Sequence, residues 1–224
     1  MHPIKYGLTR GGNALLDLLF PQSCLGCSVH GHILCDECIS SIRQVERETG
    51  EEIMALYDYR DNVIRRSIWN LKYYRKRCLG KILGKLLYGS FLEEIADIAV
   101  FSGSSPIIVM PVPMSKNRKR NRGYNQAEII ARHFCTASPD EIFKFERKII
   151  YKNKDTARQA TITNRSERLK NIKDAFGIKN KDRIKGRTII VIDDVTTTGA
   201  TLNEIIKLLK KSGAKRVVGI ALAH

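Results

Sequence analysis

Two adjacent carboxylates, Asp193 and Asp194, stand between an apolar run and a stretch of small hydroxylated residues. The run Ile189–Ile192 has the composition of a buried strand, and the pattern after Thr201 is that of an amphipathic helix. We therefore expect a strand to deliver both acids to one edge of a sheet. The stretch Thr196–Thr201 then forms the turn that opens the helix.

The chemistry of this turn suits a sugar phosphate. Backbone N–H groups and threonine hydroxyls at a helix N-terminus bind a phosphate dianion, and Gly199 lets the backbone approach it closely. The neighbouring carboxylates accept hydrogen bonds from vicinal hydroxyls, so the pair of features describes a ribose 5-phosphate. The alternative is an ordinary helix start, but a plain N-cap needs only one Ser, Thr or Asp.

Four of the six cysteines form two Cys-x-x-Cys pairs within fifteen residues: Cys24, Cys27, Cys35 and Cys38. Two such turns supply four soft ligands for tetrahedral zinc. We expect Gly26 to give the first turn a positive φ angle. Redox chemistry and unmetallated thiols are the alternatives. A segment this short cannot bury enough apolar surface to fold unaided, and a bound metal ion would take the place of a core. Together with the cysteine spacing, this favours a structural zinc ribbon.

The charge of the chain is concentrated in its C-terminal half. Of the net charge of +16, residues 116–122 contribute five cations, and residues 144–187 hold 15 Lys and Arg against 5 Asp and Glu. Such a surface attracts nucleic acid or a phosphorylated substrate, although a solvated face is the simpler explanation. The apolar run Ala14–Phe20 is far shorter than the roughly 18 residues of a bilayer span. We expect a cytoplasmic protein with no membrane span.

Alternating strand and helix patterns position these residues. Apolar residues recur at helical spacing after residues 63, 78, 126 and 201, and strands are expected at 52–59, 107–110, 149–151, 188–192 and 217–222. This order predicts an α/β fold whose parallel sheet is flanked by helices and binds ligands at the carboxyl ends of its strands. Residues 73–77 form an aromatic and basic cluster that either stacks on a nucleobase or simply joins two helices.

The segment Ile189–Thr201 closely resembles the motif by which type I phosphoribosyltransferases bind 5-phosphoribosyl-1-pyrophosphate (PRPP). The chain as a whole is similar to the ComF family, the competence-associated proteins also called GntX-like. The matching features, in chain order, are an apolar segment Ala14–Pro21 before the double Cys-x-x-Cys, Leu71-Lys72-Tyr73, Pro111-Val112-Pro113 leading to Arg122-Gly123-Tyr124-Asn125-Gln126, Thr156 and Gln159, and Arg168, Asn171 and Ala175-Phe176.

The resemblance implies a role for each part of the motif. Asp193 and Asp194 would hold the ribose hydroxyls, and magnesium would bridge the hydroxyls and the pyrophosphate. Asp193, Asp194 and Arg122 are the implied catalytic residues. The implied PRPP-binding residues are Asp193, Asp194, Val195, Thr196, Thr197, Thr198, Gly199, Ala200 and Thr201, together with Pro113, Met114, Ser115 and Lys116 of a pyrophosphate loop. The basic residues Arg118–Arg122 resemble a flexible loop that neutralises pyrophosphate.

Three functions stay open at this point. The first is DNA uptake, with single-stranded DNA bound by Arg118, Lys119, Arg120, Arg122, Arg165 and Arg168 and a DNA-uptake helicase as partner. The second is a phosphoribosyltransferase with an unknown nitrogenous acceptor, and the third is a PRPP sensor without turnover. The expected divisions are an N-terminal amphipathic helix (1–20), the zinc ribbon (21–45), a connecting strand and helical region (46–98) and the phosphoribosyltransferase domain (99–224).

Overall fold

The computed structural model describes residues 22–45, 52–103, 105–139, 141–153 and 175–224. The chain divides into two compact units, Met1–Ser41 and Ile42–His224. The expected N-terminal helix over residues 1–20 lies outside the described residues, as do Thr156, Gln159, Arg165, Arg168 and Asn171.

The described part of the first unit is built from two tight turns and the short helix α2 (Asp36–Ser40). Ser23 and His30 form an isolated antiparallel bridge across the first turn. The expectation for Gly26 is wrong, because the positive φ angles fall on Ser28 (66°) and Gly31 (92°). The turn spans the cysteine pair, closed by the Ser28 N–H that donates to the Cys24 carbonyl oxygen, and its positive φ angle falls on the residue after the second cysteine.

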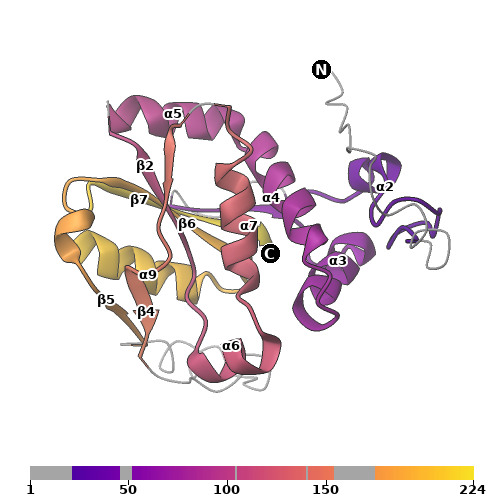
Figure 1. The fold of residues 1–224 in the computed structure, drawn as a ribbon. Coiled ribbons are helices and arrows are strands. Elements are labelled where there is room, and N and C mark those ends of the chain that lie inside the picture. The colour runs from indigo at the N-terminus through magenta and orange to yellow at the C-terminus, as the bar shows by residue number, and fades with distance from the viewer. Residues whose placement is uncertain (1–21, 46–51, 104, 140, 154–174) are drawn as a thin grey trace. The chain divides into compact units, whose positions relative to one another are not determined.

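The second unit contains a five-stranded parallel sheet in the order β1-β7-β6-β2-β3 (Figure 1). Its strands are β1 (Ile53–Tyr57), β2 (Ile107–Pro111), β3 (Phe143–Phe145), β6 (Thr188–Val195) and β7 (Arg216–Ala223). The apolar runs of β2, β6 and β7 are buried on both faces, as a parallel sheet requires. The α/β fold is confirmed.

Helices cover both faces of this sheet, as predicted. The described helices of this unit are α3 (Asn62–Tyr73), α4 (Cys78–Ser90), α5 (Leu92–Ser102), α6 (Lys116–Arg122), α7 (Gln126–Cys135) and α9 (Ala200–Lys211), with a short 3-10 turn, η2 (Lys181–Arg183). Helix α9 packs on the face that carries Ile108 and Val191. Helix α7 contacts β2, β3 and β6, and α4 packs on it through Gly84, where a Cβ would lie 2.6 Å from the Ile130 carbonyl oxygen.

Two strands of the structure differ from the sequence expectations. The strand expected at 149–151 is β4 (Ile150–Lys152), which forms an antiparallel pair with β5 (Phe176–Ile178) outside the main sheet. The short edge strand β3 was not predicted. The region expected to be a connecting strand and helical region, residues 46–98, contains β1 and the helices α3 and α4, which belong to the same compact unit as the sheet.

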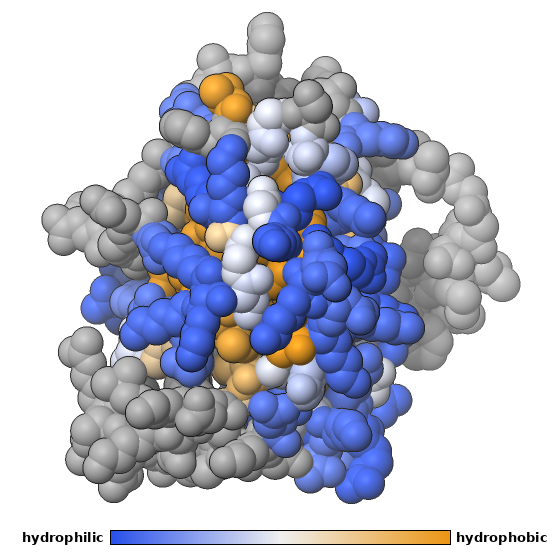
Figure 2. Space-filling model, turned by 90° about the vertical axis from the view of Figure 1, so that its left-hand side faces the viewer, coloured by the Kyte–Doolittle hydropathy of each residue, from blue (hydrophilic) through white to orange (hydrophobic). Residues whose placement is uncertain are grey.

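The surface carries few continuous apolar areas on the face shown in Figure 2, where hydrophilic side chains dominate and hydrophobic residues show between them. Among the described residues, no helix combines the length and the apolar character that crossing a bilayer requires.

Candidate functional site

The carboxyl ends of β6 and β2 lie side by side and bring together most of the described residues that the sequence singled out. Pro111 of β2 pairs with Ile192 of β6, and Val112 donates its N–H to the Ile192 carbonyl oxygen at 2.8 Å. The strand β6 is longer than predicted, so that Asp193 and Asp194 are still within it, and Asp193 is paired with Ala221 of β7. The two acids therefore sit at the end of a central strand whose position the sheet fixes.

Asp194 is turned into the protein and forms an ion pair with Lys72 of α3. Lys72 Nζ lies 2.6 Å from Asp194 Oδ2, and the two side chains are 18% and 6% exposed. Asp194 Oδ1 accepts the N–H of Val195 at 2.9 Å. Although burial lowers the pKa of Lys72, Asp194 outweighs it and raises that pKa above its usual value. Lys72 thus stays protonated and holds Asp194 in place.

Asp193 is the partly exposed acid of the pair. Its Oδ1 accepts the N–H of Asp194 at 2.9 Å. Burial and the neighbouring Asp194 carboxylate raise the pKa of Asp193 well above its usual range, against the opposing charge of Lys72. The expected pairing of both acids with ribose hydroxyls therefore requires Lys72 to share or release Asp194, whereas Asp193 is available directly.

The threonine-rich turn joins β6 to the N-terminus of α9. Thr196 is buried and donates its N–H to the Ala223 carbonyl oxygen at 2.9 Å, whereas Thr197 is exposed. Thr198 Oγ1 accepts the N–H of Ala200 at 3.4 Å. Gly199 is the N-cap with φ 69°, a left-handed conformation that favours glycine. The turn thus presents Thr197 beside a helix N-terminus, where an anion is favoured.

The loop after β2 lies at the same edge. Ser115 is buried and accepts the N–H of Arg118 at 3.4 Å, which caps α6. Asn125 caps α7 and donates from Nδ2 to the Val112 carbonyl oxygen at 2.9 Å. These two caps fix the path of residues 112–116, the loop predicted to bind pyrophosphate, next to the acids.

The basic segment after this loop is a helix and not the flexible loop that was expected. Ser115 begins α6, and Gly123, with φ 84°, ends it. All seven residues of α6 are exposed or partly exposed. Arg122 Nη1 donates to Gln126 Oε1 at 2.6 Å, and its guanidinium lies 5.2 Å from the centre of the Tyr73 ring. Its described contacts therefore link α6 to α7 and α3, and its catalytic role stays a prediction.

Sequence reasoning quoted Lys72 but assigned it no role. A signal was present, because Ile64, Ile68 and Lys72 recur at four-residue steps on α3, and the first two are fully buried. A lysine that continues a buried face needs an acidic partner. The sequence does not say which acid that is, since the two elements are more than a hundred residues apart.

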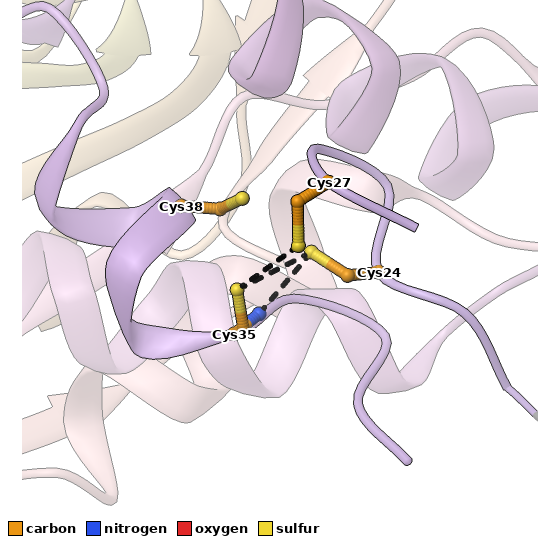
Figure 3. A group of neighbouring side chains, drawn as sticks. All are labelled: Cys24, Cys27, Cys35 and Cys38. Carbon is orange, nitrogen blue, oxygen red and sulfur yellow. Dashed lines mark hydrogen bonds between the residues drawn. The ribbon is translucent and has the colours of Figure 1, made fainter. Parts of the chain in front are cut away.

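The four cysteines of the first unit lie together, with all four sulfur atoms within 4.8 Å of one another (Figure 3). Cys35 Sγ is 3.6 Å from both Cys24 Sγ and Cys27 Sγ. The N–H groups of Gly26 and Cys35 donate to Cys24 Sγ at 3.4 Å each. Burial opposes ionisation of Cys24, but the backbone N–H groups of Cys27, Cys35 and Gly26 bring its pKa down to about 6. Zn–S bonds of about 2.3 Å place tetrahedral sulfurs at such separations, so the cluster fits zinc.

Comparison with known proteins relates both parts of the chain to others. Residues 93–224 match a family model described as phosphoribosyl transferase domain. Competence protein F of Haemophilus influenzae is 26% identical over 225 residues, which cover 100% of this chain and 93% of that protein. DNA utilization protein YhgH of Escherichia coli K12 is 27% identical over 199 residues, 89% of this chain and 81% of that protein. Competence protein ComFC of Streptococcus pneumoniae is 33% identical over 145 residues, 65% and 58% of the two chains.

The ion pair leads to a prediction about stability and pH. Replacing Lys72 with Met leaves Asp194 buried without its cation, which costs about 3 kcal/mol of unfolding free energy at pH 8. Burial and the neighbouring carboxylate already raise the pKa of Asp193, and protonation of the acid pair removes the charge that Lys72 no longer balances, so protonation favours the folded state of the variant. The deficit should shrink as the pH falls from 8 to 5. Urea unfolding of Lys72→Met and of the exposed control Lys76→Met at several pH values measures it.

Adding Asp194→Asn to Lys72→Met removes the orphaned charge, so the double variant should be more stable than Lys72→Met alone at pH 8. A Lys72→Met deficit that does not change with pH would contradict the assignment of Lys72 as the partner of Asp194.

Proposed function

The chain belongs to the phosphoribosyltransferase superfamily and to its ComF family, and on that premise we propose that the carboxyl edge of its sheet binds PRPP together with magnesium. One observation carries the proposal: the acids of β6, the threonine turn before α9 and the loop after β2 converge at this edge. In sheets of this kind, ligands bind outside the carboxyl ends of the strands.

Each part of PRPP has a matching group. Asp193 accepts hydrogen bonds from the ribose hydroxyls, and Asp194 joins it once Lys72 shares its charge. Thr197 to Thr201 bind the 5-phosphate at the N-terminus of α9, and Pro113 to Lys116 bind the pyrophosphate. Carboxylate oxygens are the donors that magnesium prefers, so the partly exposed Asp193 fits a magnesium–PRPP complex. Magnesium held there would supply positive charge next to the pyrophosphate group.

Two versions of this function share the binding step and differ in the chemistry after it. In a transferase, the protein holds the ribose while a nitrogenous acceptor replaces pyrophosphate at C1, and catalysis consists of positioning and charge stabilisation. In a sensor, PRPP binds without turnover. Release of pyrophosphate in the presence of candidate bases or amines separates the two.

Handling of single-stranded DNA is the second candidate function. The five cations of residues 116–122 have no acid among them, and α6 presents them on the surface. The names of the relatives, competence protein F and DNA utilization protein YhgH, point in the same direction for those proteins. Arg165 and Arg168 belong to this proposal by sequence only, and a DNA-uptake helicase as partner rests on the family resemblance.

The cysteine cluster completes the proposal with one structural zinc ion held by Cys24, Cys27, Cys35 and Cys38. The four sulfur atoms leave no position open for a substrate in a tetrahedral site, which is the arrangement of structural zinc.

The PRPP proposal is tested by calorimetry of magnesium–PRPP binding. Asp193→Asn removes the available acid and leaves the Lys72–Asp194 pair intact, so it should lower the affinity at least about tenfold, the loss of one or two charge-assisted hydrogen bonds. Asp182→Asn, in the exposed turn η2, serves as the control and should bind like the parent. Equal affinity of the parent and Asp193→Asn would refute the assignment.

The zinc proposal is tested by metal analysis of the purified protein. The parent should contain one zinc per chain, and Cys27→Ser should lose it, because three thiolates hold zinc far more weakly than four. Cys78→Ser removes an exposed cysteine outside the cluster and should keep the metal. Full zinc content in Cys27→Ser would rule out this ligand set.

The DNA proposal is tested by the salt dependence of binding to an oligothymidylate. Arg118→Gln with Arg120→Gln removes two cations of α6, so the slope of log affinity against log salt should become shallower by roughly 1.4. Lys207→Gln with Lys211→Gln removes the same charge from exposed positions of α9 and is the matched control. If both pairs change the slope equally, α6 is not the contact surface.

A further inference from the structure

An exposed row of aromatic rings ends α3. Trp69, Tyr73 and Tyr74 are 51%, 58% and 66% exposed. The Trp69 and Tyr73 rings, one helical turn apart, have centroids 5.0 Å apart and are tilted by 55°. Large aromatic side chains are seldom left this exposed in a group, because each leaves about half or more of a surface of roughly 150–250 Å² in water. This grouping therefore indicates a binding surface.

All the charged residues next to these rings in the sequence are cationic. Residues 62–77 contain six Lys and Arg and no acid. Lys72 turns inward to Asp194, whereas Arg75, Lys76 and Arg77 are exposed beside Tyr74. From α6, the Arg122 guanidinium lies over the Tyr73 ring at 5.2 Å. A polyanion that also carries flat aromatic rings would match both the positive charge and the aromatic rings of this surface.

The turn after α3 keeps this row at the surface. Arg75 has φ 56°, a left-handed conformation that is unfavourable for a residue with a side chain. Lys76 then donates its N–H to the Asn70 carbonyl oxygen, which closes the turn back on α3. Tyr73 and Tyr74 thus end the helix facing solvent, and the chain enters α4 at Cys78.

We propose that Trp69, Tyr73 and Tyr74, the α3 platform, bind single-stranded nucleic acid by stacking on its unpaired bases while the adjacent Arg and Lys residues of α3 and α6 contact its phosphates. The inference rests on the DNA-handling proposal for its class of ligand and assigns the base-binding surface that α6 alone does not provide. A duplex hides its base faces, so the platform selects single strands.

The helix places the platform next to the PRPP edge. Lys72, which holds Asp194, lies between Trp69 and Tyr73 in α3, and Arg122 bridges α3 and α6. A nucleic-acid strand bound to the platform would therefore lie on the helix that also positions Asp194, and it would share Arg122, one of the implied catalytic residues, with the proposed phosphoribosyl site.

The sequence offers a built-in probe, since Trp69 is the sole tryptophan. Titration of the parent with an oligothymidylate of about 15 nucleotides should quench Trp69 fluorescence, as stacking on a base requires. A duplex of equal length should bind through charge alone, with little quenching. No quenching on saturation with the single strand, as judged by anisotropy of a labelled oligonucleotide, would overturn the proposal.

The variant test uses Tyr73→Ala with Tyr74→Ala. Each lost stacking contact should weaken single-strand binding about fivefold or more, while duplex binding stays within about twofold. Tyr151→Ala is the matched control. Tyr151 is an exposed ring of β4, and the Lys179 ammonium group lies over it. Trp69→Phe keeps a stacking ring and should retain most of the affinity.

Three outcomes distinguish this inference from PRPP binding and from DNA binding by charge alone. If the tyrosine variant loses single-strand affinity and Asp193→Asn does not, the platform acts independently of PRPP binding. If the Arg118 and Arg120 variant loses affinity and the tyrosine variant does not, DNA binds by charge and the platform proposal falls. If the tyrosine variant weakens duplex and single strand equally, stacking is excluded.

Discussion

The ion pair between Lys72 and Asp194 is the contact on which the candidate site depends. It joins α3 to the end of β6 across more than a hundred residues of sequence, and it is nearly removed from solvent. Because a buried lysine needs an acid and a buried acid needs a cation, neither side chain can be changed alone without cost. The same pair also gives the two acids different roles. Asp194 is held by Lys72, whereas the partly exposed Asp193 can contact a ligand.

From this pair the site extends in two directions. Along the sheet edge, the caps Ser115 and Asn125 set the loop after β2 beside the threonine turn. Along α3, the outward side of the same helix carries Trp69 and Tyr73. Helix α3 is anchored on one side to the carboxyl edge of the sheet and exposes aromatic rings on the other, so it joins the two surfaces for which we propose PRPP and single-strand binding. The cysteine cluster belongs to the other unit, where its four sulfur atoms lie close enough together to hold one metal ion.

Much of the fold could be predicted because its elements have local signals. Buried parallel strands appear as apolar runs, as in β6 and β7, and α7 and α9 show clear helical spacing. The failures are also physical. The strand β3 has only three residues, and Phe143–Phe145 has too little pattern to be seen. The segment Lys116–Arg122 contains no apolar face, so its helix depends on the caps Ser115 and Gly123 and not on periodicity.

The sequence by itself determined the chemistry of the two clusters: paired acids before a threonine turn, and four thiols in two close pairs. Both come from residues adjacent along the chain, whose geometry a turn or a strand end imposes. Only the tertiary structure decided that Asp194 faces Lys72, that the loop after β2 joins the acids, and that Tyr73 meets Arg122. These contacts join distant segments through strand order and helix packing, which local spacing does not encode.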